Sequence, residues 1–153
     1  MEFEQQKFEM EGEPQEISPE IIRAVEESSF SIMDKTDILL VKAGLKPASI
    51  LNLYTHEEYT SGMKIDLNEQ EIKKSKRLIK TIFADHVETG IILDESNDAA
   101  AAGKTAKHEH IDFLVGANAE KLERLNEALK NKNEREIGLA LGYCPTAVEA
   151  YVG

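Results

Sequence analysis

The chain has 153 residues, 41% of them apolar and 31% charged, which suits one domain with a core of its own. Its single cysteine excludes an intramolecular disulfide, and with it a disulfide-rich secreted scaffold. The net charge of −11 disfavours non-specific binding of nucleic acid, because phosphate backbones are repelled on average. No apolar run approaches the roughly 20 residues of a membrane span, and the acidic N-terminus does not resemble a signal peptide. We therefore expect a cytoplasmic protein with no membrane partner.

The negative charge is concentrated near the N-terminus. Residues 1–28 hold nine acidic and two basic side chains, a net charge of −7, which leaves −4 for the other 125 residues. Residues 1–16 are rich in Glu and Gln and contain too few apolar groups to offset the entropy lost on ordering. The sequence thus predicts an acidic flexible tail over residues 1–16 and a single α+β domain over residues 17–153.

In the first half of the chain, the pattern predicts two helices and then a strand. Ser-Pro-Glu at 18–20 is typical of a helix start, with Ser at the N-cap and Pro in the first turn. A second helix is predicted over 34–43, ended by Gly44. The apolar run 49–54 reads as a buried strand, and 55–59 as a short helical turn capped by its threonine.

The middle of the chain predicts a helix followed by two strands. Asn-Glu-Gln-Glu at 68–71 resembles a capping box and opens a helix that extends to about Ala84. Strands are predicted over 89–94 and 111–115, separated by a loop over 95–107.

The last third of the chain predicts helices. Asn118 and Asn133 are placed to cap two of them, Gly142 ends the second, and Pro145 starts a last short one. The expected fold class is α+β, with a small sheet of about three strands packed by several helices and a C-terminal helical hairpin.

The segment 134–152 has the spacing of a helix-turn-helix, with a turn glycine and apolar residues at the required positions, Ile137, Leu141, Gly142 and Val148. A DNA-binding protein of this type would contact the bases with the exposed side of the last helix. That side offers Thr146 and Glu149 and none of the usual donors to bases and phosphates. Nucleic acid is therefore the disfavoured partner, and two short packed helices are the alternative interpretation.

The same part of the chain carries a resemblance. Gly116 before an amphipathic helix, then Arg-Glu-Ile-Gly at 135–138 and Leu-Gly-Tyr-Cys-Pro-Thr-Ala-Val-Glu-Ala-Tyr at 141–151, resembles the C-terminus of a family of uncharacterised small prokaryotic, mainly archaeal, proteins. That family has a C-terminal helix pair of the Leu-Gly-Tyr-Pro type. Here Cys144 precedes the proline and no cysteine pair follows. The resemblance implies a helix pair and no particular activity.

His108-Glu109-His110-Ile111-Asp112 is the candidate metal cluster. In an extended strand, alternation places His108, His110 and Asp112 on one face, and two imidazoles with a carboxylate suit a divalent metal such as Zn²⁺. His86 and Glu88 would approach them if the two predicted strands pair as a hairpin. The alternative interpretation is a polar outer face of a strand whose inner face carries Ile111 and Phe113.

Two further features bear on function. Basic side chains crowd one face of the helix that starts near residue 69, at Lys73, Lys76, Arg77 and Lys80, with Lys74 beside them. This face suits an anionic ligand, RNA or the protein's own acidic tail, or it is simply solvated. Cys144 is either a nucleophile at a helix start or a small buried apolar residue.

No candidate set of catalytic residues has the sequence context that its chemistry requires. The leading hypothesis is therefore a non-enzymatic module that binds a protein partner or itself as a homo-oligomer. One alternative is a metal-binding protein or metal-dependent hydrolase that uses His108, His110 and Asp112. Another is nucleic-acid binding through a degenerate helix-turn-helix at 134–152. We expect no cofactor, apart from the divalent metal of the first alternative.

Overall fold

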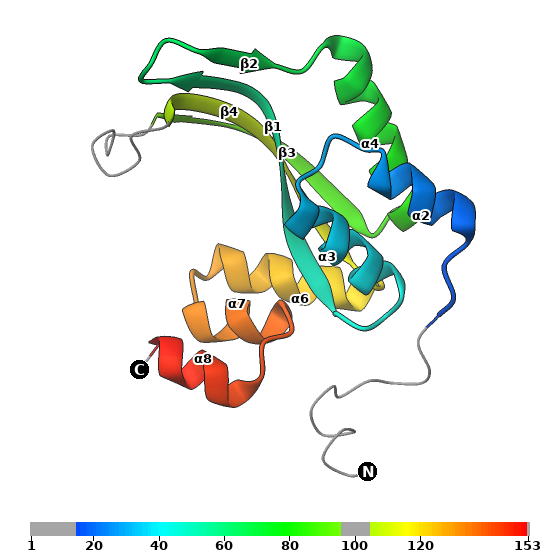
Figure 1. Ribbon diagram of the computed structural model, residues 1–153. Coiled ribbons are helices and arrows are strands. Elements are labelled where there is room, and N and C mark those ends of the chain that lie inside the picture. The colour runs from blue at the N-terminus through cyan, green and yellow to red at the C-terminus, as the bar shows by residue number, and fades with distance from the viewer. Residues whose placement is uncertain (1–14, 96–104, 153) are drawn as a thin grey trace.

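A computed structural model describes residues 15–95 and 105–152 of the chain (Figure 1). These residues form six helices and four strands in the order α2 (Pro19–Glu26), α3 (Ile32–Lys42), β1 (Ala48–Tyr59), β2 (Lys64–Asp66), α4 (Glu69–Phe83), β3 (Val87–Glu95), β4 (Thr105–Gly116), α6 (Ala119–Lys130), α7 (Glu134–Ala140) and α8 (Pro145–Val152). The predicted α+β class is confirmed. The predicted tail lies mostly outside the described residues, as does most of the predicted loop over 95–107.

The helices begin where the sequence places their caps. The side chains of Ser18, Asn68, Asn118 and Asn133 each accept a hydrogen bond from the backbone N–H three residues on. Each bond satisfies a donor that would otherwise be unpaired in the first turn. Helix α3 starts two residues earlier than predicted, because Ser31 rather than a later residue provides its cap.

The sheet is antiparallel throughout, in the order β2-β1-β4-β3, so the predicted count of about three strands is corrected to four. The predicted helical turn over 55–59 is wrong, because β1 continues through Tyr59. Local capping chemistry favoured the turn, but pairing with β4 and β2 satisfies the same backbone groups in extended form. A register shift between Tyr54 and His56 marks a bulge, at which the buried Thr55 hydroxyl donates to the Glu109 carbonyl oxygen at 3.2 Å.

Strand β2 was missed because its three residues are all exposed and carry no apolar alternation. It is held by backbone pairing at 56–58 of β1 and by side-chain contacts. His56 Nδ1 contacts Asp66 Oδ1, and Lys64 Nζ lies 3.3 Å from Glu58 Oε1. The hydrogen bond to Asp66 raises the pKa of the His56 imidazole above its ordinary value.

One face of the sheet carries the main core. Helices α2, α3 and α4 cover this face (Figure 1), and the inward residues of β1 and β4 are paired across it, Leu53 with Ile111 and Leu51 with Phe113. The helices contribute buried apolar side chains at Val25, Ile38, Val41, Ile79, Ile82 and Phe83. Ile111 and Phe113, which the alternation along 111–115 placed on an inner face, are buried in this core. Among the described residues, no helix has the length and apolar character needed to cross a bilayer.

Of the described residues, helices α6 and α7 cover the opposite face, and they do so at one end. A second, smaller cluster of Ala48, Leu125 and Ala140, with Ile50 and Leu114 beside it, packs α6 and α7 against the start of β1 and the end of β4. The sheet curves away from these helices (Figure 1), so the rest of this face stands apart from them.

Candidate functional site

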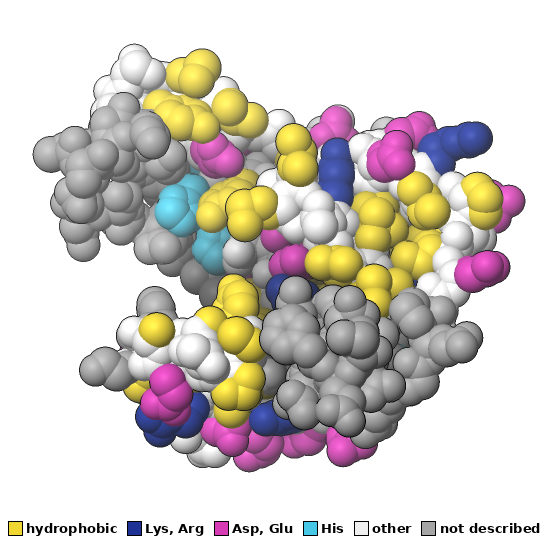
Figure 2. Space-filling model, turned by 60° about the horizontal axis from the view of Figure 1, so that its bottom comes forward, with side chains coloured by type: hydrophobic (Ala, Val, Ile, Leu, Met, Phe, Trp, Pro, Cys, Tyr) yellow, Lys and Arg dark blue, Asp and Glu magenta, His cyan; other side chains and the backbone are white. Residues whose placement is uncertain are grey.

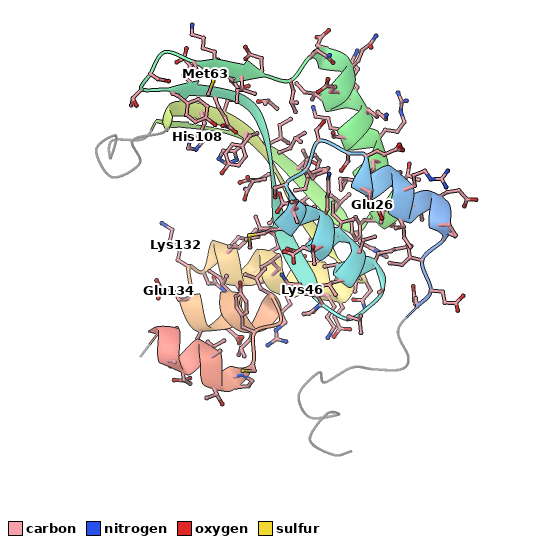
Figure 3. All side chains as sticks on the ribbon, in the orientation of Figure 1. Glu26, Lys46, Met63, His108, Lys132 and Glu134 are labelled. Carbon is pink, nitrogen blue, oxygen red and sulfur yellow. The ribbon has the colours of Figure 1, made fainter. Side chains whose placement is uncertain are left out.

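Beyond the part covered by α6 and α7, this face includes five side chains that we group as the open strip: Asn52 and Tyr54 of β1, and His108, His110 and Asp112 of β4. Alternation along β4 places the histidines and the aspartate together, as the sequence predicted, while Ile111 and Phe113 enter the core. Histidine side chains lie in a hollow of the surface in Figure 2, and Figure 3 shows His108 facing the helical part that carries Lys132 and Glu134.

A hydrogen-bonded chain joins three residues of the open strip. His110 is 7% exposed, and its Nδ1 lies 2.8 Å from Asp112 Oδ1. The same oxygen accepts a hydrogen bond from Nδ2 of Asn52, which is directly opposite Asp112 in the strand pairing. Asp112 therefore fixes both the His110 ring and the Asn52 amide, and a buried polar group is satisfied within the strip.

Tyr54 completes the strip as an aromatic partner of both histidines. Its ring centroid lies 5.4 Å from that of His108 and 5.3 Å from that of His110, and the two imidazoles are 5.5 Å apart. These separations suit edge-to-face and tilted ring contacts. Sequence reasoning missed Tyr54 because only the register of β1 on β4, which pairs Tyr54 with His110, brings it there.

Helix α3 supports the strip from the side. The backbone N–H of Asn52 donates to Oδ2 of Asp34 at 3.1 Å, since β2 pairs with β1 only further along, at 56–58. Burial raises the pKa of the Asp34 carboxyl above its ordinary value. The first turn of α3 is thereby tied to the middle of the open strip.

The predicted metal cluster is assembled on one face, but its donors do not converge. Asp112 is bonded to His110 and Asn52, and the described part of the chain has no group of three His, Cys, Asp or Glu side chains placed to hold a metal ion. The predicted hairpin of β3 and β4 forms. Its register pairs Val87 with Val115, so His86 lies at the opposite end of β4 from His108, and its expected approach to the histidines is wrong. Glu88 pairs with Leu114, on the same face of the sheet as Asp112 and two residues along from it.

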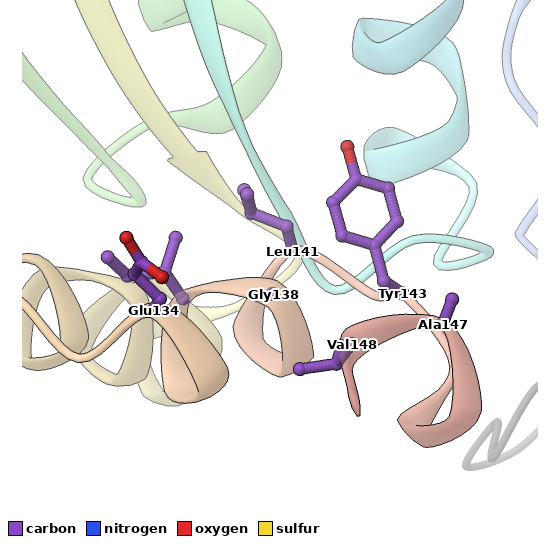
Figure 4. Close-up of a pocket in the computed structure, with 7 residues that line it drawn as sticks. Glu134, Gly138, Leu141, Tyr143, Ala147 and Val148 are labelled. Carbon is purple, nitrogen blue, oxygen red and sulfur yellow. The ribbon is translucent and has the colours of Figure 1, made fainter. Parts of the chain in front are cut away.

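Helices α7 and α8 form an apolar pocket of about 560 Å³ (Figure 4). It is lined by Glu134, Ile137, Gly138, Leu141, Tyr143, Ala147 and Val148. Leu141 also packs on the smaller core cluster, which connects the pocket to the covered end of the sheet. Tyr143 is 58% exposed, so the pocket presents a large aromatic side chain to solvent. The sequence predicted the helix pair and its apolar residues, but it did not predict the pocket between the two helices.

The α7–α8 pair has the predicted helix-turn-helix spacing. Gly142 forms the turn, and a Cβ added at Gly138 would lie 2.9 Å from Cγ2 of the buried Val148. Arg135 makes two bonds to Glu149, Nε to Oε1 at 2.6 Å and Nη2 to Oε2 at 3.1 Å, which hold the pKa of that carboxyl below its usual range. Helix α8 has no lysine or arginine of its own, so contacts to phosphates would have to come from other elements.

Cys144 corrects one expectation. The thiol is exposed rather than buried as a small apolar residue. It sits at the start of α8, in the turn that joins the two helices, where its carbonyl oxygen accepts from the Val148 N–H.

The chain matches no known protein family, no curated protein and no solved structure. The resemblance of the C-terminal segment to a prokaryotic family therefore stays a prediction.

Proposed function

We propose that this protein is a non-enzymatic binding module that holds an apolar segment of a protein partner in the pocket between α7 and α8. The observation that carries the proposal is the lining of that pocket, in which Glu134 is the one charged residue among seven. Its volume of about 560 Å³ falls within the range of roughly 300–1,000 Å³ that binding pockets occupy.

Exposed apolar side chains elsewhere support a protein partner. Ile32 and Met33, in the first turn of α3, are both 80% exposed, and Tyr54 of the open strip is 44% exposed. Asp34, in the same turn of α3, bonds the backbone of Asn52, so this turn borders the strip. Large exposed apolar groups that gather in this way mark interaction sites, and tyrosine is enriched among residues that dominate binding energy.

The proposal predicts that a cation introduced among the lining residues of the pocket weakens binding. Peptides selected from a random library against the immobilised protein should carry aromatic or aliphatic anchors. Ala147→Arg, which places a cation among the lining residues, should weaken their affinity at least tenfold, because the cation must be desolvated or the anchor displaced. Isothermal titration calorimetry with the selected peptides measures the change.

Thr146→Arg is the matched control, since Thr146 is the exposed neighbour of Ala147 on α8 and does not line the pocket. Equal loss in both variants would contradict the assignment of the pocket, as would selected peptides without apolar anchors. Sedimentation of the wild-type protein tests a second copy as the occupant. A dimer that dissociates in Ala147→Arg and persists in Thr146→Arg would make the partner another copy of this chain. Turnover of any common substrate class would overturn the non-enzymatic assignment.

Divalent-metal binding by His108, His110 and Asp112 is the second candidate, favoured by the two imidazoles 5.5 Å apart on the open strip. A metal would have to draw Asp112 away from His110 or bind the imidazoles alone. Elemental analysis of untagged protein beside a His108→Ala/His110→Ala double variant tests it. Near-stoichiometric metal that is lost in the variant supports this function and justifies hydrolase assays, and metal-free wild-type protein removes it.

A further inference from the structure

Helix α4 presents an uncovered basic face. Its buried side is formed by Ile79, Ile82 and Phe83, with Ser75 one turn before Ile79. All five cations of the helix are exposed and lie on the remaining side: Lys73, Lys74, Lys76, Arg77 and Lys80. We call these five residues the basic face.

The basic face is electrostatically unbalanced. The residues that the structure describes provide no ion pair to any of its five cations, whereas Lys46, Lys64, Arg124 and Arg135 each have a carboxylate partner. The only acidic residues of α4 are Glu69 and Glu71, in the first turn. Five like charges on 15 residues repel one another, and an anionic partner would relieve that repulsion.

The matching negative charge is in the chain itself. Residues 1–14, which lie outside the described residues, contain five glutamates and one lysine, a net charge of −4. A free polyanion would have to approach a protein whose overall charge is −11. The N-terminal segment meets the same average repulsion, but its covalent attachment keeps it at a high effective concentration beside the domain.

The described chain begins close to the C-terminal end of α4. The backbone N–H of Gln15 donates to the Ala43 carbonyl oxygen at 2.9 Å, and the neighbouring Lys42 donates through Nζ to the Ile82 carbonyl oxygen at 3.4 Å. The start of the described chain and the C-terminal end of α4 therefore meet at the same end of α3. Fourteen extended residues reach up to about 46 Å, twice the ~22 Å length of a 15-residue helix.

From this juxtaposition we propose that the acidic segment 1–14 binds the basic face of α4 within the same molecule and masks it from other anions. The tether gives the segment an effective concentration of about 1 mM, so even a weak contact is populated. The contact is electrostatic and loosens with salt, because exposed charges are screened within about 8 Å at physiological ionic strength and about 3 Å at 1 M.

The test compares the full-length wild type with a variant in which Glu2, Glu4, Glu9, Glu11 and Glu13 are all replaced by Gln. A fluorescein-labelled synthetic peptide of residues 1–14 is titrated into each protein at low salt, and its anisotropy is followed. We expect the neutralised variant to bind the peptide about tenfold more tightly than the wild type, because its own segment no longer competes. Adding Lys76→Glu and Arg77→Glu to that variant should remove binding.

The matched control adds Lys130→Glu and Lys132→Glu instead, an equal change of charge at two exposed residues of the α6–α7 region, and should leave binding in place. A second readout locates the contact. Backbone amide shifts that differ between the wild type and the Gln variant should fall on residues 73–80 and vanish at about 1 M salt. Equal affinities for the peptide, equal loss in the control, or shifts at α7 and α8 instead would overturn the proposal.

Discussion

Replacing Phe113 by alanine is expected to lower the free energy of unfolding by about 3–5 kcal/mol, the range measured for deleting a buried aromatic ring. Phe113 is 1% exposed on the central strand β4. Its ring centroid lies 5.8 Å from that of Phe30 at 65°, an edge-to-face contact, and Leu51 is its partner across the strands. This loss of stability is the sum of two free energies: the transfer free energy of the deleted ring and the cost of the cavity that it leaves.

Urea unfolding followed by circular dichroism measures this change, and an unchanged denaturant slope shows that the same surface is exposed in both proteins. A domain is stable by roughly 5–15 kcal/mol, so the alanine variant keeps only part of its native stability. Phe113→Leu is the control that remains folded in any case, with an expected loss below about 2 kcal/mol, since most of the volume is retained. A loss below about 1 kcal/mol in the alanine variant would show that Phe113 is not packed as the structure has it.

Replacing Gly142 by alanine is expected to lower the free energy of unfolding by about 2–4 kcal/mol, because two separate costs combine. Gly142 has a φ of +96°, a backbone conformation that side chains with a Cβ disfavour by about 1–2 kcal/mol. An added Cβ would also lie 2.8 Å from Cδ of Pro47, which has no freedom to rotate away. The turn between α7 and α8 would therefore separate from the loop that precedes β1, and the pocket would lose its support.

Gly62 provides the matched control for that prediction. Its φ is also +96°, but a Cβ there would meet no atom within 4 Å. Gly62→Ala should therefore show the backbone cost alone, and the difference between the two variants measures the contact with Pro47. Thermal and urea unfolding of both variants give the two values. Equal losses would mean that Gly142 is needed for its backbone conformation only.

The binding experiments depend on the same turn. Gly142→Ala is expected to reduce affinity for the selected peptides as well as stability, whereas Gly62→Ala lies in the β1–β2 turn and should leave affinity unchanged. This separation distinguishes damage to the pocket from a general loss of stability.

Local sequence signals were enough for the helices and their faces. Capping by Ser18, Asn68, Asn118 and Asn133 acts over three residues, so it is readable without any knowledge of the fold. The same holds for the cations that share one face of α4 and for the alternation along β4, since both follow from the period of one element. The grouping of His108, His110 and Asp112 on one face was predictable for this reason.

The features that depend on pairing between distant segments were decided only by the tertiary structure. The extension of β1 through Tyr59 and the existence of β2 require a ladder between residues with no apolar pattern. The register of β1 and β3 on β4 brought Asn52 and Tyr54 to the histidines and took His86 away from them. The sequence by itself determined which side chains share a face. Contacts between segments that are distant in the sequence determined the hydrogen-bonded strip and the apolar pocket, because register and packing depend on the whole chain at once.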